Sequence, residues 1–180
     1  MGDRPRIKRK TDTQQLIVDP LAFTVNKATS LGRKIIEYSV NINFEIWEDK
    51  HVAVRRQHGD DLGKREGIDK EIVSQLVKDS LPFLIHFSIK NNRFSFISPS
   101  ESSERKIRVI LQKECNDLIL LNVVVECHLL DITKYEMTII TAMKLNGFNV
   151  SDGQFALRLY TDGASLNQNQ RGTIQEIDTV

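Results

Sequence analysis

Three side chains suited to phosphate chemistry fall at helical spacing within residues 48–67, EDKHVAVRRQHGDDLGKREG. If residues 49–58 form a helix, His51, Arg55 and His58 occupy positions i, i+4 and i+7 along one face. One neutral imidazole could take the proton from a ribose 2′-hydroxyl, and a protonated one could donate a proton to the leaving 5′-oxygen. The arginine could hold the phosphate while charge builds on its oxygens. The pattern is typical of metal-independent RNA cleavage, and equally of a plain solvated helix face.

Further cationic residues follow this stretch, and others lie near the N-terminus. Arg56, Lys64 and Arg65 are candidates to hold the RNA backbone. A basic arm near the N-terminus contains five more: Arg4, Arg6, Lys8, Arg9 and Lys10. The net charge of the chain is only +1, but local clusters suffice for local phosphate contacts. We expect the arm to add phosphate affinity rather than chemistry.

Other kinds of site find little support in the sequence. His51 and His58 would be separated by about 10 Å of helical rise, too far to share one ion. The chain has no HExxH, CxxC, GxGxxG, Walker or GxSxG motif, so we expect no metal and no cofactor. His86 and His128 lie in strand-like runs and are interpreted as packed or edge histidines. Cys127 is not a catalytic partner of His128, because neighbours on a strand point to opposite faces.

Composition indicates a globular chain. Its 180 residues are 40% hydrophobic and 27% charged, which fits one domain with a real core. No apolar run approaches the roughly 18 residues of a membrane span, and no apolar segment follows the basic N-terminus as in a signal peptide. Cys115 and Cys127 are interpreted as two reduced core thiols. We therefore expect a cytoplasmic protein with no membrane contact.

The first elements show clear local signals. Alternation over residues 37–49 predicts a half-buried strand, and KHVAVRRQHG a short helix. A second helix should begin after the N-cap Asp69, with Ile68 packed onto Val73 as a hydrophobic staple. Pro82 should end or kink this helix.

Beyond Pro82 the period changes to two, which predicts strands. They are FLIHFSI, RFSFI, RKIRVILQKE, LILLNVVVECHLLD, YEMTIITAMKL and, as a possible last one, QFALRLYTDG. Their short separators favour antiparallel hairpins. We therefore expect an α+β fold, with two N-terminal helices packed on a twisted antiparallel sheet and an extended basic N-terminal arm. The arm should cover residues 1–30, the domain residues 31–161, and a polar tail residues 162–180.

In this order the elements resemble the barnase/EndoU/colicin/RelE-like (BECR) RNase toxin superfamily, in its phage-associated or DUF4258-like branch. The resemblance covers roughly residues 38–145 and rests on DKHVAVRRQHG, GIDKEIVSQLVKDSLP and the hairpin sheet ending in YEMTIITAM. In such families a late strand often carries a Thr or Ser facing the cleft, and Thr141 holds that position here. Thr141 is also plausible as an ordinary strand residue. The resemblance implies a possible cognate antitoxin or immunity protein.

The leading hypothesis is an endoribonuclease that cleaves RNA by 2′-hydroxyl transesterification. His51 and His58 would be general base and acid, Arg55 would stabilise the phosphorane, and Thr141 would orient the phosphate. RNA is the expected partner, with no small-molecule cofactor. The alternative is a non-catalytic nucleic-acid- or protein-binding module of phage or bacterial origin.

Overall fold

The computed structural model describes residues 23–40, 42–58, 68–99, 106–115 and 118–180. The elements in chain order are β1 (Gly32–Val40), β2 (Ile42–Asp49), α1 (Lys50–His58), α2 (Lys70–Lys90), β3 (Ile97–Ser98), β4 (Arg108–Glu114), β5 (Leu120–Asp131), β6 (Lys134–Lys144), β7 (Phe155–Tyr160), β8 (Gly163–Gln170) and β9 (Thr173–Thr179).

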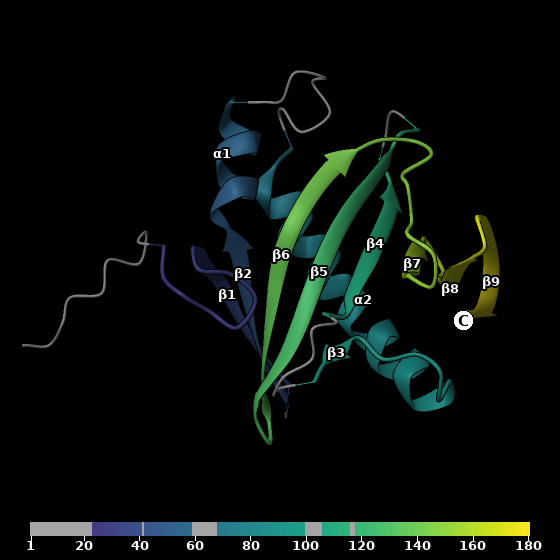
Figure 1. Cartoon of the computed structure of the whole chain (residues 1–180), viewed down its shortest axis with the longest axis horizontal. Helices are drawn as coiled ribbons and strands as arrows, with labels where there is room; N and C mark the ends of the chain where they lie inside the picture. The colour runs from purple at the N-terminus through teal and green to yellow at the C-terminus, as the bar shows by residue number, and fades with distance from the viewer. Residues whose placement is uncertain (1–22, 41, 59–67, 100–105, 116–117) are drawn as a thin grey trace, which may run out of the picture.

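All described strands join one mixed sheet. Its order is β1-β2-β6-β5-β4-β7-β8-β9, with β3 beside β5 (Figure 1). Three pairings are parallel: β2 with β6, β3 with β5, and β4 with β7. The two helices pack against this sheet, with α2 behind its centre and α1 near β2 and β6.

The expected fold class is wrong in its helix order and in its sheet. Two strands precede both helices, and the sheet is mixed rather than antiparallel. The single strand expected over residues 37–49 belongs to two antiparallel strands, β1 and β2. Alternation of apolar and polar residues indicates a strand but does not indicate which strand it pairs with. Here β2 pairs with β6, which lies far along the chain.

The helix α1 is confirmed at its predicted position. Of its residues, Val52 is buried and faces the sheet. The sequence of α1, KHVAVRRQH, contains no acidic residue. Its first turn is held by Asp49, whose Oδ1 accepts the backbone N–H of His51 at 2.7 Å.

The start of α2 is also confirmed. Asp69 has extended backbone angles and its side chain accepts the N–H of Glu71 at 2.9 Å. Ile68 and Val73 are both buried in the main core, as the hydrophobic staple requires. Local capping chemistry therefore places this helix start correctly.

Of the two outcomes expected at Pro82, an end or a kink of α2, the end is wrong, and so is the strand predicted over FLIHFSI. The helix continues through Pro82 to Lys90. Leu81, Leu84 and Phe87 are fully buried at helical spacing. A proline inside a helix costs about 3 kcal/mol, whereas burying each large apolar side chain contributes about 1.5–3 kcal/mol. Burial therefore outweighs the proline.

Residues 162–180 are not a polar tail without a core face. They form the hairpin β8–β9, which extends the sheet next to β7. Ala164, Ser165 and Leu166 are fully buried there. Asn167, Gln168, Asn169 and Gln170 follow as four polar residues in a row, so no apolar alternation marked the strand.

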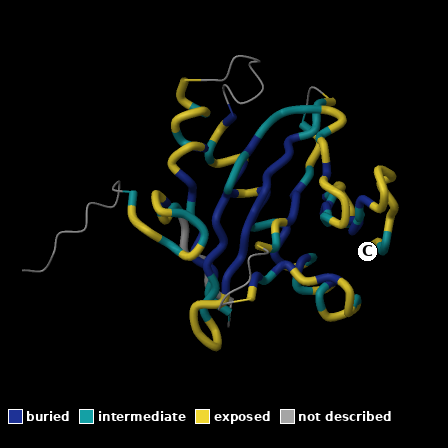
Figure 2. Tube along the Cα trace, viewed as in Figure 1, coloured by how far each residue is buried: buried dark blue, intermediate teal, exposed yellow. Residues whose placement is uncertain are grey.

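The two faces of the sheet differ in chemistry. The face toward α2 carries the main apolar core. The opposite face holds a small apolar cluster around Ile110 and Val124, and beside it a row of buried polar side chains. The central strand β5 is buried along most of its length, and β6 is buried mainly in its first half (Figure 2). Residues 23–31, called here the N-terminal strap, lie on this polar face and bond to β6.

Candidate functional site

The outer face of α1 presents the predicted catalytic residues to solvent. His51, Arg55 and His58 are all exposed, as is Lys50. The carboxylates just before the helix, Glu48 and Asp49, are buried instead. Among the described residues, the exposed side of α1 therefore carries the cations Lys50 and Arg55, while the carboxylates of Glu48 and Asp49 are turned inward.

Arg55 and Thr141 lie at the same small cavity, between α1 and β6. Val52, Ile68 and Val73 line its apolar part. Its volume is about 10 Å³, which is room for about one water and not for a phosphate. Neither predicted catalytic histidine is among the residues that line it. Arg55 and Thr141 thus both line this small cavity, but a substrate would have to bind on the surface of α1.

Arg56 is turned inward, unlike its neighbour Arg55. Its guanidinium forms a close ion pair with Glu48, which also accepts a hydrogen bond from Arg33 at 2.9 Å. Arg56 could hold RNA only by leaving this carboxylate. The other two predicted backbone-binding residues, Lys64 and Arg65, lie outside the described residues, as does the basic arm.

The N-terminal strap is fastened to the beginning of α1. The Oγ1 of Thr29 donates a short hydrogen bond to Asp49, the carboxylate that caps the first turn of the helix. The N–H of Lys50 donates to the carbonyl of Leu31 at 2.8 Å. The helix is therefore fixed at its N-terminal end, with its cationic face outward.

A buried polar cluster that was not expected from the sequence lies on the face opposite α2. The Nε2 of His128 lies 2.8 Å from Oε1 of Glu126, a carboxylate with no exposed surface. Across the β5–β6 ladder, His128 pairs with Glu136, and Glu45 on β2 pairs with Glu136 from the other side. His128 is thus a packed histidine, as expected, but one with a carboxylate partner.

The two glutamates beside one another in this cluster have opposite pKa shifts. Burial raises the pKa of Glu136, and the hydrogen bond from the N–H of Lys27 offsets only part of that effect. Burial would also raise the pKa of Glu45, but its bonds to Lys134 and Lys34 outweigh burial and lower it. Glu136 is therefore the carboxyl that gains a proton more readily.

A histidine oriented by a carboxylate, next to a carboxyl of raised pKa, has the composition of an acid–base site. Here the strap closes it: Lys27 bonds to Glu136, and the Nδ2 of Asn26 donates to Thr138 at 2.6 Å. The sequence signal was the spacing of polar residues at every second position, Glu126 with His128 and Glu136 with Thr138, inside apolar strands.

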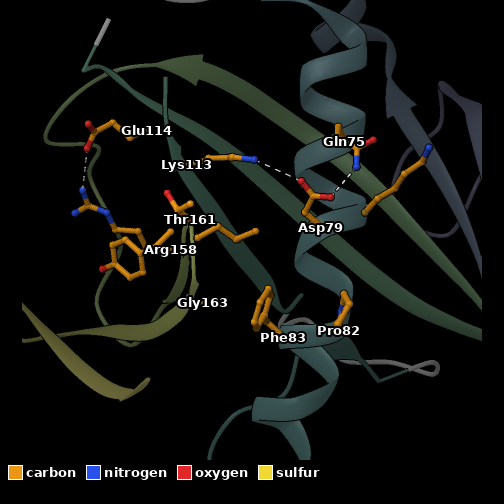
Figure 3. Close-up of a pocket in the computed structure, with 12 residues that line it drawn as sticks. Gln75, Asp79, Pro82, Phe83, Lys113, Glu114, Arg158, Thr161 and Gly163 are labelled. Carbon is orange, nitrogen blue, oxygen red and sulfur yellow. Dashed lines mark hydrogen bonds and ion pairs between the residues drawn. The ribbon is translucent and has the colours of Figure 1, made fainter. Parts of the chain in front are cut away.

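A groove of about 880 Å³ runs between α2 and the strands β4 and β7 (Figure 3). Its charges are largely paired within the groove. Lys113 lies 3.5 Å from Asp79, and Arg158 lies 3.6 Å from Glu114. The groove is therefore less suited to a polyanion than the exposed face of α1.

Within the described ranges, no three His, Cys, Asp or Glu side chains are grouped as metal ligands, and no helix is long and apolar enough to cross a membrane. Cys115 and Cys127 are free.

The fold and its surface define a mostly-β domain with a cationic helix beside the sheet. Comparison with protein-family models, with curated proteins and with solved structures gives no match.

Proposed function

We propose that this protein binds RNA through the outer face of α1. The observation that carries the proposal is the separation of charge around this helix. Lys50, His51, Arg55 and His58 are exposed, whereas the adjacent carboxylates Glu48 and Asp49 are buried and already bonded. Lys50 and Arg55 are thus exposed cations beside carboxylates that are buried, and exposed cations are the electrostatic footprint of a nucleic-acid contact.

The contact is expected to be with phosphates rather than with bases. The exposed face is one short helix, and the cavity behind Arg55 is too small for a base. Phosphate contacts release counterions, so the affinity should fall with salt by a slope of about 0.7 per contact on single strands. Binding would accordingly depend little on the RNA sequence.

Fluorescence anisotropy with a labelled oligouridine tests the proposal. The double substitution Lys50→Gln with Arg55→Gln should weaken binding roughly tenfold, equivalent to about 1.4 kcal/mol, and flatten the salt slope. The matched control is Arg171→Gln, a neutralised exposed cation in the turn between β8 and β9. Equal affinities of all three proteins would reject α1 as the interface.

RNA cleavage is the second candidate function, as the resemblance to the RNase toxins implies. Its support is the position of Thr141, which lines the same cavity as Arg55, with two exposed histidines on the same helix. A cleavage product with a cyclic phosphate end, formed in excess EDTA, would establish this activity. If the RNA stays intact after prolonged incubation, RNA cleavage is rejected and RNA binding without catalysis is the remaining function. An antitoxin or immunity partner and a cytoplasmic location belong to the same candidate function.

A further inference from the structure

The N-terminal strap is held to the sheet by hydrogen bonds and not by apolar burial. The side chain of Asn26 donates to Thr138 at 2.6 Å, and the N–H of Lys27 donates to Glu136 at 2.8 Å. None of residues 23–31 is buried, and none belongs to the apolar core. A segment with so few buried contacts opens at a lower free energy than the core does. The strap can therefore leave the sheet while the core stays folded.

The helix α1 has little stability of its own. It contains nine residues, whereas isolated helices shorter than about 12–15 residues are marginal in water. Val52 is its one buried residue, and its first turn has no acidic side chain to favour the positive end of the helix dipole. The ion pair of Arg56 with Glu48 holds the last turn and not the first. The first turn therefore depends on groups outside the helix.

The first turn of α1 and the strap share one carboxylate. Oδ1 of Asp49 accepts the N–H of His51 at 2.7 Å, and its Oδ2 accepts the hydroxyl of Thr29. The carbonyl of Leu31, at the end of the strap, accepts the N–H of Lys50 at 2.8 Å. The first N–H groups of a helix have no partner within the helix, and here two of them are bonded by Asp49 and Leu31. The strap thus holds both acceptors where α1 needs them.

Between its anchors the strap forms a tight turn. The N–H of Thr29 donates to the side chain of Asn26 at 2.8 Å, and the N–H of Asn26 donates to the carbonyl of Thr29 at 3.0 Å. Both residues also lie against Gly32, where an added methyl group would be 3.1 Å from Cγ2 of Thr29 and 3.2 Å from Nδ2 of Asn26. Asn26, which is bonded to β6, and Thr29, which is bonded to Asp49, therefore move together.

We propose that docking of the strap onto β6 orders the first turn of α1 and thereby controls RNA binding by its exposed face. When the strap is released, Asp49 loses one partner and the N–H of Lys50 loses its acceptor, so the turn frays. The effect on RNA rests on the proposed function, whereas the coupling of strap and helix does not. Linkage requires that RNA bound to α1 tighten the strap by the same factor by which the strap strengthens RNA binding.

Amide hydrogen exchange of the full chain tests the coupling, with Asn26→Ala as the first variant. Among the described residues, Asn26 has no hydrogen bond to α1 or to Asp49, so this substitution reaches the helix only by releasing the strap. Exchange of the N–H groups of Lys50 and His51 should become at least about fivefold faster. Exchange in the buried strand β5 should not change.

Thr29→Val and Thr24→Val form a matched pair within the strap. The first keeps the shape of the side chain but removes the hydroxyl that bonds Asp49, so it should also speed exchange of the first turn. The second removes a hydroxyl at an exposed position and should not. If Asn26→Ala instead speeds exchange throughout β5, its effect is global unfolding and Thr29→Val decides.

Fluorescence anisotropy with a labelled oligouridine measures the effect on RNA. Asn26→Ala should weaken binding at least about fivefold, and saturating oligouridine should slow exchange of the Lys27 N–H in the unmodified chain. Unchanged exchange at Lys50 and His51 in both Asn26→Ala and Thr29→Val would overturn the coupling. Faster exchange with unaltered RNA affinity would overturn the control of RNA binding. If the unmodified chain does not bind oligouridine, the proposed function fails, and exchange alone still decides whether strap and helix are coupled.

Discussion

The guanidinium of Arg56 bonds the carboxylate of Glu48 through both of its outer nitrogens, with Nη2 3.3 Å from Oε2. Arg33 donates to the same carboxylate at 2.9 Å. One buried anion therefore joins α1 to β1. Arg55, next in the sequence, is exposed. Two adjacent arginines thus have different surroundings, and their substitutions should have different effects.

Arg56→Ala should lower the free energy of unfolding by about 1.5–3 kcal/mol, the range of hydrogen bonds to charged groups. It should leave oligouridine binding nearly unchanged. Arg55→Ala should change the unfolding free energy by no more than about 0.5 kcal/mol but weaken RNA binding. Urea unfolding and anisotropy measure the two quantities. A loss of RNA affinity in Arg56→Ala as large as in Arg55→Ala would show that Arg56 leaves Glu48 to bind RNA.

Glu136→Gln should alter how stability depends on pH. Burial raises the pKa of Glu136 in the folded protein, so the folded state holds this proton more tightly than the unfolded state does. The stabilisation that Glu136 contributes is therefore fully present at pH values below the pKa it has in the unfolded chain. It is lost as the pH rises through the higher pKa that Glu136 has in the folded protein. Lys27 can still donate to the glutamine oxygen, while Glu45 and His128 keep their places on the adjoining strands.

Thermal melts measure this effect. The variant should melt above the unmodified chain at neutral pH, and the difference should vanish below the unfolded carboxyl pKa of about 4.3. Glu176→Gln, at an exposed position of β9, serves as the control and should leave the melting curve unchanged at each pH. A variant that melts lower than the unmodified chain at neutral pH would mean that Glu136 is stabilised as a carboxylate.

Leu166→Ala tests whether β8 belongs to the core. Leu166 has no exposed surface, so its truncation should cost about 2–5 kcal/mol of unfolding free energy. Ile174→Ala on β9, where the side chain is 53% exposed, should cost far less. Chemical denaturation of both variants is the measurement. Similar small losses of unfolding free energy in the two variants would show that residues 162–180 are a tail outside the core.

If RNA is cleaved, His51→Ala and His58→Ala should each slow cleavage strongly, with little change in melting temperature because both side chains are exposed. Their effects should not add, since base and acid act as one unit. The rate should have a bell-shaped dependence on pH, because one group must act as a base and the other as an acid. If both variants cleave RNA at the normal rate, His51 and His58 of α1 are not catalytic residues.

Neutralising the five cations of residues 4–10 should weaken RNA binding and reduce its salt dependence without altering the melting temperature. Each lost phosphate contact should lower the slope by about 0.7. A salt titration of the anisotropy signal measures the slope. An unchanged slope would assign the arm to a protein partner.

Local chemistry made parts of the fold predictable. Asp69 marks the beginning of α2 because a side-chain acceptor is needed there, and the pairing of Ile68 with Val73 follows from the same motif. Residues 83–89 were misread because FLIHFSI alternates as a strand does, while Leu84 and Phe87 also fit a helix. Only packing against the sheet decides between these two periods.

The candidate site was predictable in composition but not in geometry. Helical spacing correctly placed His51, Arg55 and His58 on the exposed side of α1. The inward turn of Arg56 depends on Glu48, which reaches it from the preceding strand. The polar cluster around Glu136 depends on the parallel pairing of β2 with β6, and no local signal specifies that pairing.

That parallel pairing also has a consequence for how the chain acquires its fold. The hairpin β1–β2 is synthesised early, but β2 must wait for β6, since Asn43 pairs with Lys134. Contacts between such distant segments form slowly, because a long loop must close first. Until then β2 has an unpaired edge, open to pairing with other chains. Translation speed before residue 144, and chaperone binding to the nascent hairpin, should therefore govern the yield of native protein.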